Sequence, residues 1–142
     1  METALRIIVF QVGTEYFGME IKRVEGIVEN TPMTETTDVY PSDIVGMLNL
    51  QSVVVPVWNL YEKLQIKPLA VHGDSCFIIL RFNEKWIALP VDGVERYYDV
   101  PLQCLRPVPA FALRPETGGS QWIADLDGRL IPILDVERLI GM

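Results

Sequence analysis

The side chains in this chain that could support catalysis are few and lie far apart in the sequence. His72 is the only histidine, and no serine or cysteine stands beside it in a recognisable nucleophile motif. The glycine-rich residues 118–120 are followed by Gln121 and Trp122, whereas a phosphate-binding P-loop continues with Lys and Ser or Thr. We interpret His72 as a solvated linker residue and residues 118–120 as an ordinary loop.

Two pairs of acidic residues could in principle hold a cation or divide the roles of acid and base. They are Glu35 with Asp38, and Asp125 with Asp127. Turns and strand ends carry acidic residues routinely, so we interpret both pairs as turn residues rather than as a metal or catalytic site.

Cys76 and Cys104 lie among apolar neighbours and have no metal-ligand spacing, which indicates reduced, buried thiols rather than a disulfide. Together these patterns predict a protein that is not an enzyme and has no cofactor and no metal.

The composition narrows the class of partner. Twelve Lys and Arg against nineteen Asp and Glu give a net charge of −7, which repels nucleic acid and anionic lipid surfaces. No apolar run approaches the roughly 18 residues of a membrane-spanning helix, and the first residues lack the pattern of a signal peptide. We therefore expect a cytoplasmic protein that neither inserts into a membrane nor binds nucleic acid.

An internal repeat organises the chain and positions these side chains. Offset by 70, residues 8–12 match residues 78–82, and residues 16–21 match residues 86–91. Each copy reads as a strand, a short polar turn and a second strand, which is the pattern of a β-hairpin. At 142 residues the chain has the usual length of one domain.

A second pair of segments matches at an offset of 76, where residues 53–60 align with residues 129–136. Both segments run from a strand containing a proline into a short helix with a polar capping residue, Asn59 or Asp135. We predict one all-β domain over residues 1–142 with short helices. Its two subdomains, residues 1–70 and 71–142 approximately, share an apolar interior. Exchange of a terminal segment between the subdomains remains open.

Several motifs in order resemble those of the CheW-like family of chemotaxis coupling proteins. Residues 8–24 resemble the family's LVF-x-LG-x-E-x-YGI start, and residues 44–60 resemble its V-x-G-V-x-NLRG signature with the following (I/V)P-(I/V)-x-DL. Residues 88–94 match its G-x-x-VD-x-V strand and turn. Residues 105–109 resemble its I-x-P-x-P loop, and residues 126–130 its LDGRL turn. The resemblance covers nearly the whole chain.

The resemblance implies a fold, a role and a location. The fold would be two intertwined, five-stranded SH3-like barrels related by a pseudo-twofold axis. The role would be that of a non-catalytic adaptor or scaffold, which couples the cytoplasmic tips of chemoreceptors to the regulatory domain of a CheA-type histidine kinase. Such an adaptor is cytoplasmic and is recruited peripherally to receptor arrays.

The resemblance also implies a receptor-binding groove between the barrels, to which five positions map. They are Val24, Gly46, Asn49, Gln51 and Ser52. For the first two, filling the core and permitting a bend are equally good explanations.

The chain departs from the family pattern at the last two of these positions, because the family's NLRG becomes Asn49-Leu50-Gln51-Ser52. Gln51 is neutral and lacks the five-donor fork of an arginine guanidinium. Ser52 replaces a glycine, which is tolerable at negative φ and strained at positive φ. This departure puts the identity of the receptor in question.

Two other functions stay open at this point. One is an adaptor of a related pathway such as twitching motility, where CheW-like proteins also join a receptor to a kinase. The other, of a different class, is a small-molecule sensor that uses the cleft between the barrels.

Overall fold

The computed structural model describes residues 3–35, 43–69, 76–109 and 120–140, and His72, Asp38 and residues 118–119 lie outside these ranges. The strands are β1 (Thr3–Val12), β2 (Glu15–Glu20), β3 (Val24–Glu29), β4 (Thr34–Glu35), β5 (Ile44–Leu50), β6 (Val53–Trp58), β7 (Cys76–Phe82), β8 (Lys85–Val91), β9 (Gly93–Pro101), β10 (Leu105–Pro107), β11 (Trp122–Leu126) and β12 (Arg129–Ile133). The helices are η1 (Ile21–Arg23), α1 (Leu60–Leu64), η2 (Leu102–Cys104) and α2 (Val136–Leu139).

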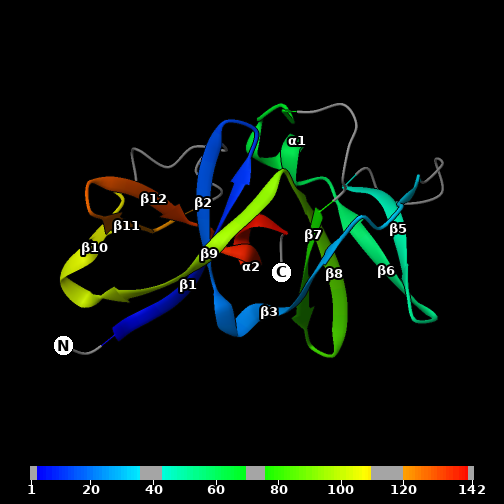
Figure 1. Cartoon of the computed structure of the whole chain (residues 1–142), viewed down its shortest axis with the longest axis horizontal. Helices are drawn as coiled ribbons and strands as arrows, with labels where there is room; N and C mark the ends of the chain where they lie inside the picture. Colours follow the sequence, from blue (N-terminus) through cyan, green and yellow to red (C-terminus); the bar gives the residue numbers. More distant parts are fainter. Residues whose placement is uncertain (1–2, 36–42, 70–75, 110–119, 141–142) are drawn as a thin grey trace.

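The strands form two sheets of equal size (Figure 1). Sheet A has the order β10-β11-β12-β2-β1-β9, and sheet B has the order β3-β7-β8-β6-β5-β4. Each helix is only three to five residues long. The predicted all-β fold with short helices is therefore confirmed.

Each sheet must curl, because its two outermost strands are neighbours in sequence. In a flat sheet of six strands, β3 and β4 would lie about 24 Å apart at the usual spacing of 4.7–4.9 Å. Only residues 30–33 join them, and so short a segment spans at most about 18 Å. The same holds for β9 and β10, joined by η2. When β3 and β4 are counted as one bent strand, sheet B becomes a barrel of five strands. Counting β9 and β10 in the same way makes sheet A a barrel of five strands.

The two sheets exchange hairpins. Sheet A contains the β1–β2 hairpin from the start of the chain together with strands β9 to β12. Sheet B contains strands β3 to β6 together with the later β7–β8 hairpin. Both sheets thus draw strands from both sides of residue 70, and the division of the chain into subdomains near that residue stays a prediction.

The pairing of strands follows the sequence repeat. In sheet A, β12 lies parallel to β2 through the pair Ile133↔Gly18, and in sheet B, β6 lies parallel to β8 through Val57↔Ala88. Position 57 maps onto 133 by the offset of 76, and position 18 maps onto 88 by the offset of 70. The two sheets therefore have their parallel bridges at repeat-related positions, as expected if a pseudo-twofold axis relates one sheet to the other.

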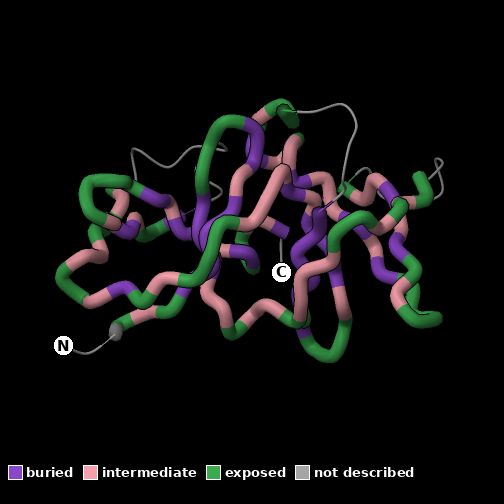
Figure 2. Tube along the Cα trace, in the orientation of Figure 1, coloured by how far each residue is buried: buried purple, intermediate pink, exposed green. Residues whose placement is uncertain are grey.

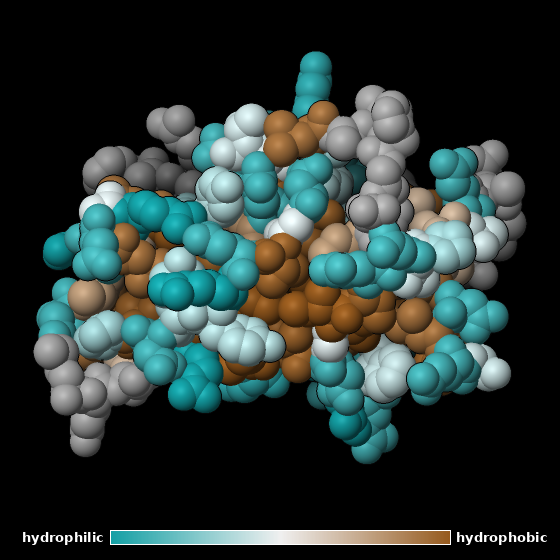
Figure 3. Space-filling view, viewed as in Figure 1, coloured by the Kyte–Doolittle hydropathy of each residue, from teal (hydrophilic) through white to brown (hydrophobic). Residues whose placement is uncertain are grey.

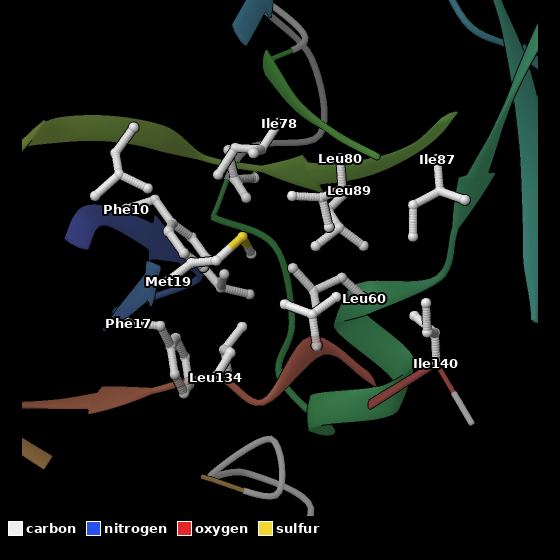
Figure 4. Close-up of a cluster of buried hydrophobic side chains, with 14 of the residues drawn as sticks. Phe10, Phe17, Met19, Leu60, Ile78, Leu80, Ile87, Leu89, Leu134 and Ile140 are labelled. Atoms are coloured by element: carbon white, nitrogen blue, oxygen red, sulfur yellow. The ribbon is translucent and has the colours of Figure 1, made fainter. Parts of the chain in front are cut away.

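One central core joins the two sheets. It gathers buried side chains from β1, β2, β7, β8 and both α-helices, and Figure 4 shows them converging from opposite sides. Each sheet also has a smaller cluster of its own, one around Ile7 and Val100 and one around Leu48 and Val57. In Figure 2 the buried segments lie along the inner strands, whereas the turns of the β5–β6, β7–β8 and β11–β12 hairpins are exposed. Stability therefore depends chiefly on contacts between the sheets.

Asp92, in the bend between β8 and β9, ties three distant segments together. Its carboxylate accepts hydrogen bonds from the backbone N–H of Gly13 and from the hydroxyl of Tyr61, the latter at 2.9 Å. The backbone N–H of Leu69 donates a third hydrogen bond at 3.2 Å. The β1–β2 turn, α1 and the segment after α1 are thereby held to the β8–β9 bend, and we call this group the Asp92 junction.

The Asp92 junction predicts a loss of stability at alkaline pH. Burial raises the pKa of Tyr61, and the hydrogen bond to Asp92 raises it further. An unfolded tyrosine loses its proton near pH 10, while folded Tyr61 still holds it. Because the folded state then binds more protons, the free energy of unfolding should fall as the pH rises above about 10.

Urea unfolding at about pH 8 and about pH 11 measures this slope. Tyr61→Phe should flatten it, and Tyr97→Phe, at a side chain with 58% of its surface exposed, is the matched control. Equal slopes for the Tyr61 variant and the unaltered protein would contradict the assignment.

Candidate functional site

The β5–β6 hairpin brings three of the five predicted site residues together. Asn49 lies near the end of β5, exposed and opposite Val54 of β6. Gln51 and Ser52 form the two-residue turn, also exposed, with φ values of 50° and 72°. A two-residue hairpin turn with positive φ at both positions has the type I′ pattern, whose twist suits the flanking strands.

Gly46 lies on β5 of the same hairpin, farther from the turn, where it is buried in close contact with β4. A Cβ atom at this position would lie 2.5 Å from Cγ of Met33 and 2.7 Å from the carbonyl oxygen of Thr34. Gly46 pairs with Glu35 of β4 on one side and with Val57 of β6 on the other. Any side chain here would push β4 away, so the backbone alone explains the glycine.

Val24 lies on a different strand, at the start of β3, where it pairs with Leu80 of β7. It is half-buried and packs against the central core. On the face seen in Figure 3, apolar surface gathers over the middle of the molecule, and β3 borders it. Val24 therefore contributes to the core, and the structure does not bring it to the hairpin turn.

The tip of the β5–β6 hairpin extends beyond the strands on either side of it. Next to β5, the short strand β4 pairs with only Met47 and Gly46, and β8 meets β6 in the single parallel bridge at Val57. Val53 and Val54 consequently keep 44% and 63% of their surface exposed. Sequence reasoning read these valines as ordinary strand residues and missed their exposure. No residue pattern in the hairpin signals this exposure, because it depends on where the neighbouring strands end.

Ser52 is strained, and relief of that strain is testable. A non-glycine residue in the left-handed region costs about 1–2 kcal/mol, and the repeat-related position in the β11–β12 turn is Gly128, with φ of 91°. Ser52→Gly is expected to raise the free energy of unfolding by about 1 kcal/mol in urea denaturation. The reciprocal control, Gly128→Ser, should lower it by a similar amount. A Ser52→Gly variant less stable than the unaltered protein would argue against strain.

The interior between the sheets is filled by side chains. Members of the central core such as Phe10, Leu80 and Leu89 have no more than 7% of their surface exposed. A surface hollow of about 290 Å³ lies at another place, between β2, β11 and the start of α2, with Trp122 in its wall. This packing does not favour a small-molecule sensor built on a cleft between the barrels. Within the described residues, no helix is long and apolar enough to cross a membrane.

The comparisons with known proteins agree with this geometry. The family model of the CheW-like domain matches residues 6–142. Chemotaxis protein CheW of Klebsiella aerogenes is 27% identical over 134 residues, which are 94% of this chain and 80% of that protein. Probable chemotaxis protein CheW of Rhizobium etli is 27% identical over 135 residues, which are 95% of this chain and 86% of that protein.

Among solved structures, the scaffolding protein TtCheW from Thermoanaerobacter tengcongensis has a TM-score of 0.83 and 25% sequence identity. The match covers 97% of this chain and 93% of that chain. The strand order, the repeat and the family model thus point to one assignment over almost the full length. This chain belongs to the CheW-like domain family.

Proposed function

We propose that this adaptor of the CheW family couples the cytoplasmic tips of chemoreceptors to the regulatory domain of a CheA-type histidine kinase. The observation that carries the proposal is the match of the family model to residues 6–142, together with the close structural likeness to a protein described as a scaffold. In this role the chain contributes binding surfaces and no catalytic group.

The receptor-facing surface in this proposal includes the tip of the β5–β6 hairpin. Asn49, Gln51 and Ser52 occupy the family's NLRG segment there and are exposed. Gly46 supports this surface from behind, since it lets β4 approach β5. Val24 lies apart from the hairpin tip, on β3 against the central core, and we propose it as a second part of the receptor-facing groove. The chain would be cytoplasmic and held at receptor arrays only through its protein partners.

Reconstitution with purified proteins tests the proposal. The chain is mixed with a chemoreceptor tip fragment and a CheA-type kinase from the same genome, and complexes are resolved by size-exclusion chromatography. We expect the chain to bind each partner separately and to make kinase autophosphorylation respond to the receptor fragment. Failure to bind the kinase would contradict the adaptor role, as would an equal response of the kinase in the absence of the chain.

Variants for this experiment should avoid Gly46. A substitution such as Gly46→Asp would displace β4, because its side chain would meet the backbone of Thr34. A loss of binding could then reflect altered folding. Substitutions of exposed residues at the hairpin tip would separate a loss of binding from a loss of folding.

A further inference from the structure

The β5–β6 hairpin carries no charge over its whole length. Residues 44–58 contain no Asp, Glu, Lys or Arg, although charged residues make up 22% of the chain. The repeat-related segment, residues 120–134, contains Asp125, Asp127 and Arg129. The two hairpins share a fold and a turn geometry, so the barrel does not require the absence of charge.

The uncharged hairpin is also the one that presents aliphatic side chains at its tip. Val54 has 63% of its surface exposed, and Val53 has 44%. Between them and β5 lie Gln51 and Ser52, whose polar groups are neutral. Figure 2 shows this tip as exposed, at the end of the molecule farthest from the N-terminus. The hairpin tip is therefore a small, neutral surface, partly aliphatic, on a chain whose net charge is −7.

Charge complementarity limits what such a surface can bind. A partner carboxylate or guanidinium that docked here would lose its hydration and would meet no opposite charge from residues 44–58. Burying an unpaired charge is costly, whereas burying apolar groups is favourable. A neutral, apolar partner segment therefore fits this tip better than a charged one.

We infer that the segment of the chemoreceptor tip contacted by this hairpin is uncharged and largely apolar, and that the contact is non-ionic. This inference rests on the proposed function, since it specifies the partner of the same surface. Gln51 sets the specificity for an uncharged receptor segment, because its amide both donates and accepts hydrogen bonds and can pair with neutral polar groups. An arginine at this position would instead favour a carboxylate.

A pair of substitutions with opposite charge tests the inference. Val54→Lys and Val54→Glu both place a charge at the exposed tip, and the Kd for a chemoreceptor tip fragment from the same genome is measured by titration calorimetry. If the partner segment is neutral, both variants should weaken binding about tenfold, which corresponds to about 1.4 kcal/mol. Binding of the unaltered chain should change little between low and high ionic strength.

Leu130 provides the matched control. It occupies the repeat-related position on β12 and has 60% of its surface exposed, so Leu130→Lys and Leu130→Glu should leave the Kd unchanged. Binding of the kinase regulatory domain by each variant confirms that the fold is intact.

The outcomes separate this inference from the proposed function. Tighter binding by one of the two Val54 variants, with a gain that shrinks at high salt, would reveal a charged partner and overturn the inference alone. So would normal receptor binding by both variants, because the tip would then not be the contact. If the unaltered chain binds no receptor fragment at all, the proposed function fails and the inference falls with it.

Discussion

Replacement of Phe10 by alanine is expected to lower the free energy of unfolding by about 3–5 kcal/mol. Phe10 lies on β1, has no exposed surface, and stacks on Phe17 of β2 with ring centroids 6.4 Å apart. In Figure 4 Phe10 lies on the side of Ile78, and Phe17 lies beside Leu134, within the same central core. Because this cluster is where the two sheets meet, the cavity left by the ring weakens both of them. Urea denaturation measures the loss, and Phe10→Leu, which leaves a smaller cavity, should lose less.

The shared core also predicts that the two sheets unfold together. Trp122 lies in sheet A and Trp58 in sheet B, so variants in which Trp122 or Trp58 is the sole tryptophan, with Trp86 also replaced, report on each sheet separately by fluorescence. We expect the same midpoint from both probes, with and without the Phe10 substitution. Leu102→Ala, at a side chain with 70% of its surface exposed, is the control and should change stability by less than about 0.5 kcal/mol. Two separate midpoints would show that the sheets are independent.

Replacement of Asp92 by alanine is expected to lower the free energy of unfolding by about 2–4 kcal/mol, as measured by thermal and urea denaturation. The substitution leaves the Gly13 and Leu69 N–H groups and the Tyr61 hydroxyl without the acceptor that they share. Gly13 is buried and Tyr61 is partly buried, so water replaces these hydrogen bonds incompletely. Tyr61→Phe removes only one donor, and its expected loss is smaller, about 1.5–3 kcal/mol.

The matched control for Asp92 is Asp99, an exposed aspartate whose carboxylate pairs with Arg6 at 2.7 Å. Surface ion pairs contribute little, so Asp99→Ala should change stability by no more than about 1 kcal/mol. If the Asp92 and Asp99 variants lost equal stability, the Asp92 junction would have no special role in the fold.

Half of the twelve labelled strands could be predicted because the sequence repeats. Matches at offsets of 70 and 76 identified two hairpins, two proline-containing strands and two capped helices, and the structure contains all of them. Asn59 and Asp135 cap α1 and α2 through side chains that accept hydrogen bonds from Glu62 and Arg138. These features depend on local residue types and on periodicity, which a single sequence records directly.

The exchange of hairpins could not be predicted in the same way. A hairpin such as β1–β2 has the same pattern of buried and exposed residues whether it completes its own barrel or the other one. The choice depends on the direction that the chain takes through η1 between β2 and β3, which the pattern of the hairpin itself does not record. For the same reason the role of Asp92 could not be predicted, since its donors come from positions far away in sequence.

The candidate site was predictable only in part. Family resemblance placed Asn49, Gln51 and Ser52 on one surface, and the strand pairing explains why they share a hairpin tip. The strain at Ser52 depended on the sign of φ, which sequence left undecided, and the structure resolves it as positive. The exposure of Val54 arises because neighbouring strands end early, a tertiary property without a local signature.

The exchanged hairpins bear on how such a chain arose. Each repeat supplies one hairpin and the remaining strands of one barrel, so two half-length copies could build the same pair of barrels, each lending its first hairpin to the other. The present chain has the arrangement that duplication and fusion of the gene for such a hairpin-exchanged homodimer would give. Within one chain the two copies are free to differ, and the β5–β6 hairpin has no charged residue whereas its repeat-related twin has Asp125, Asp127 and Arg129.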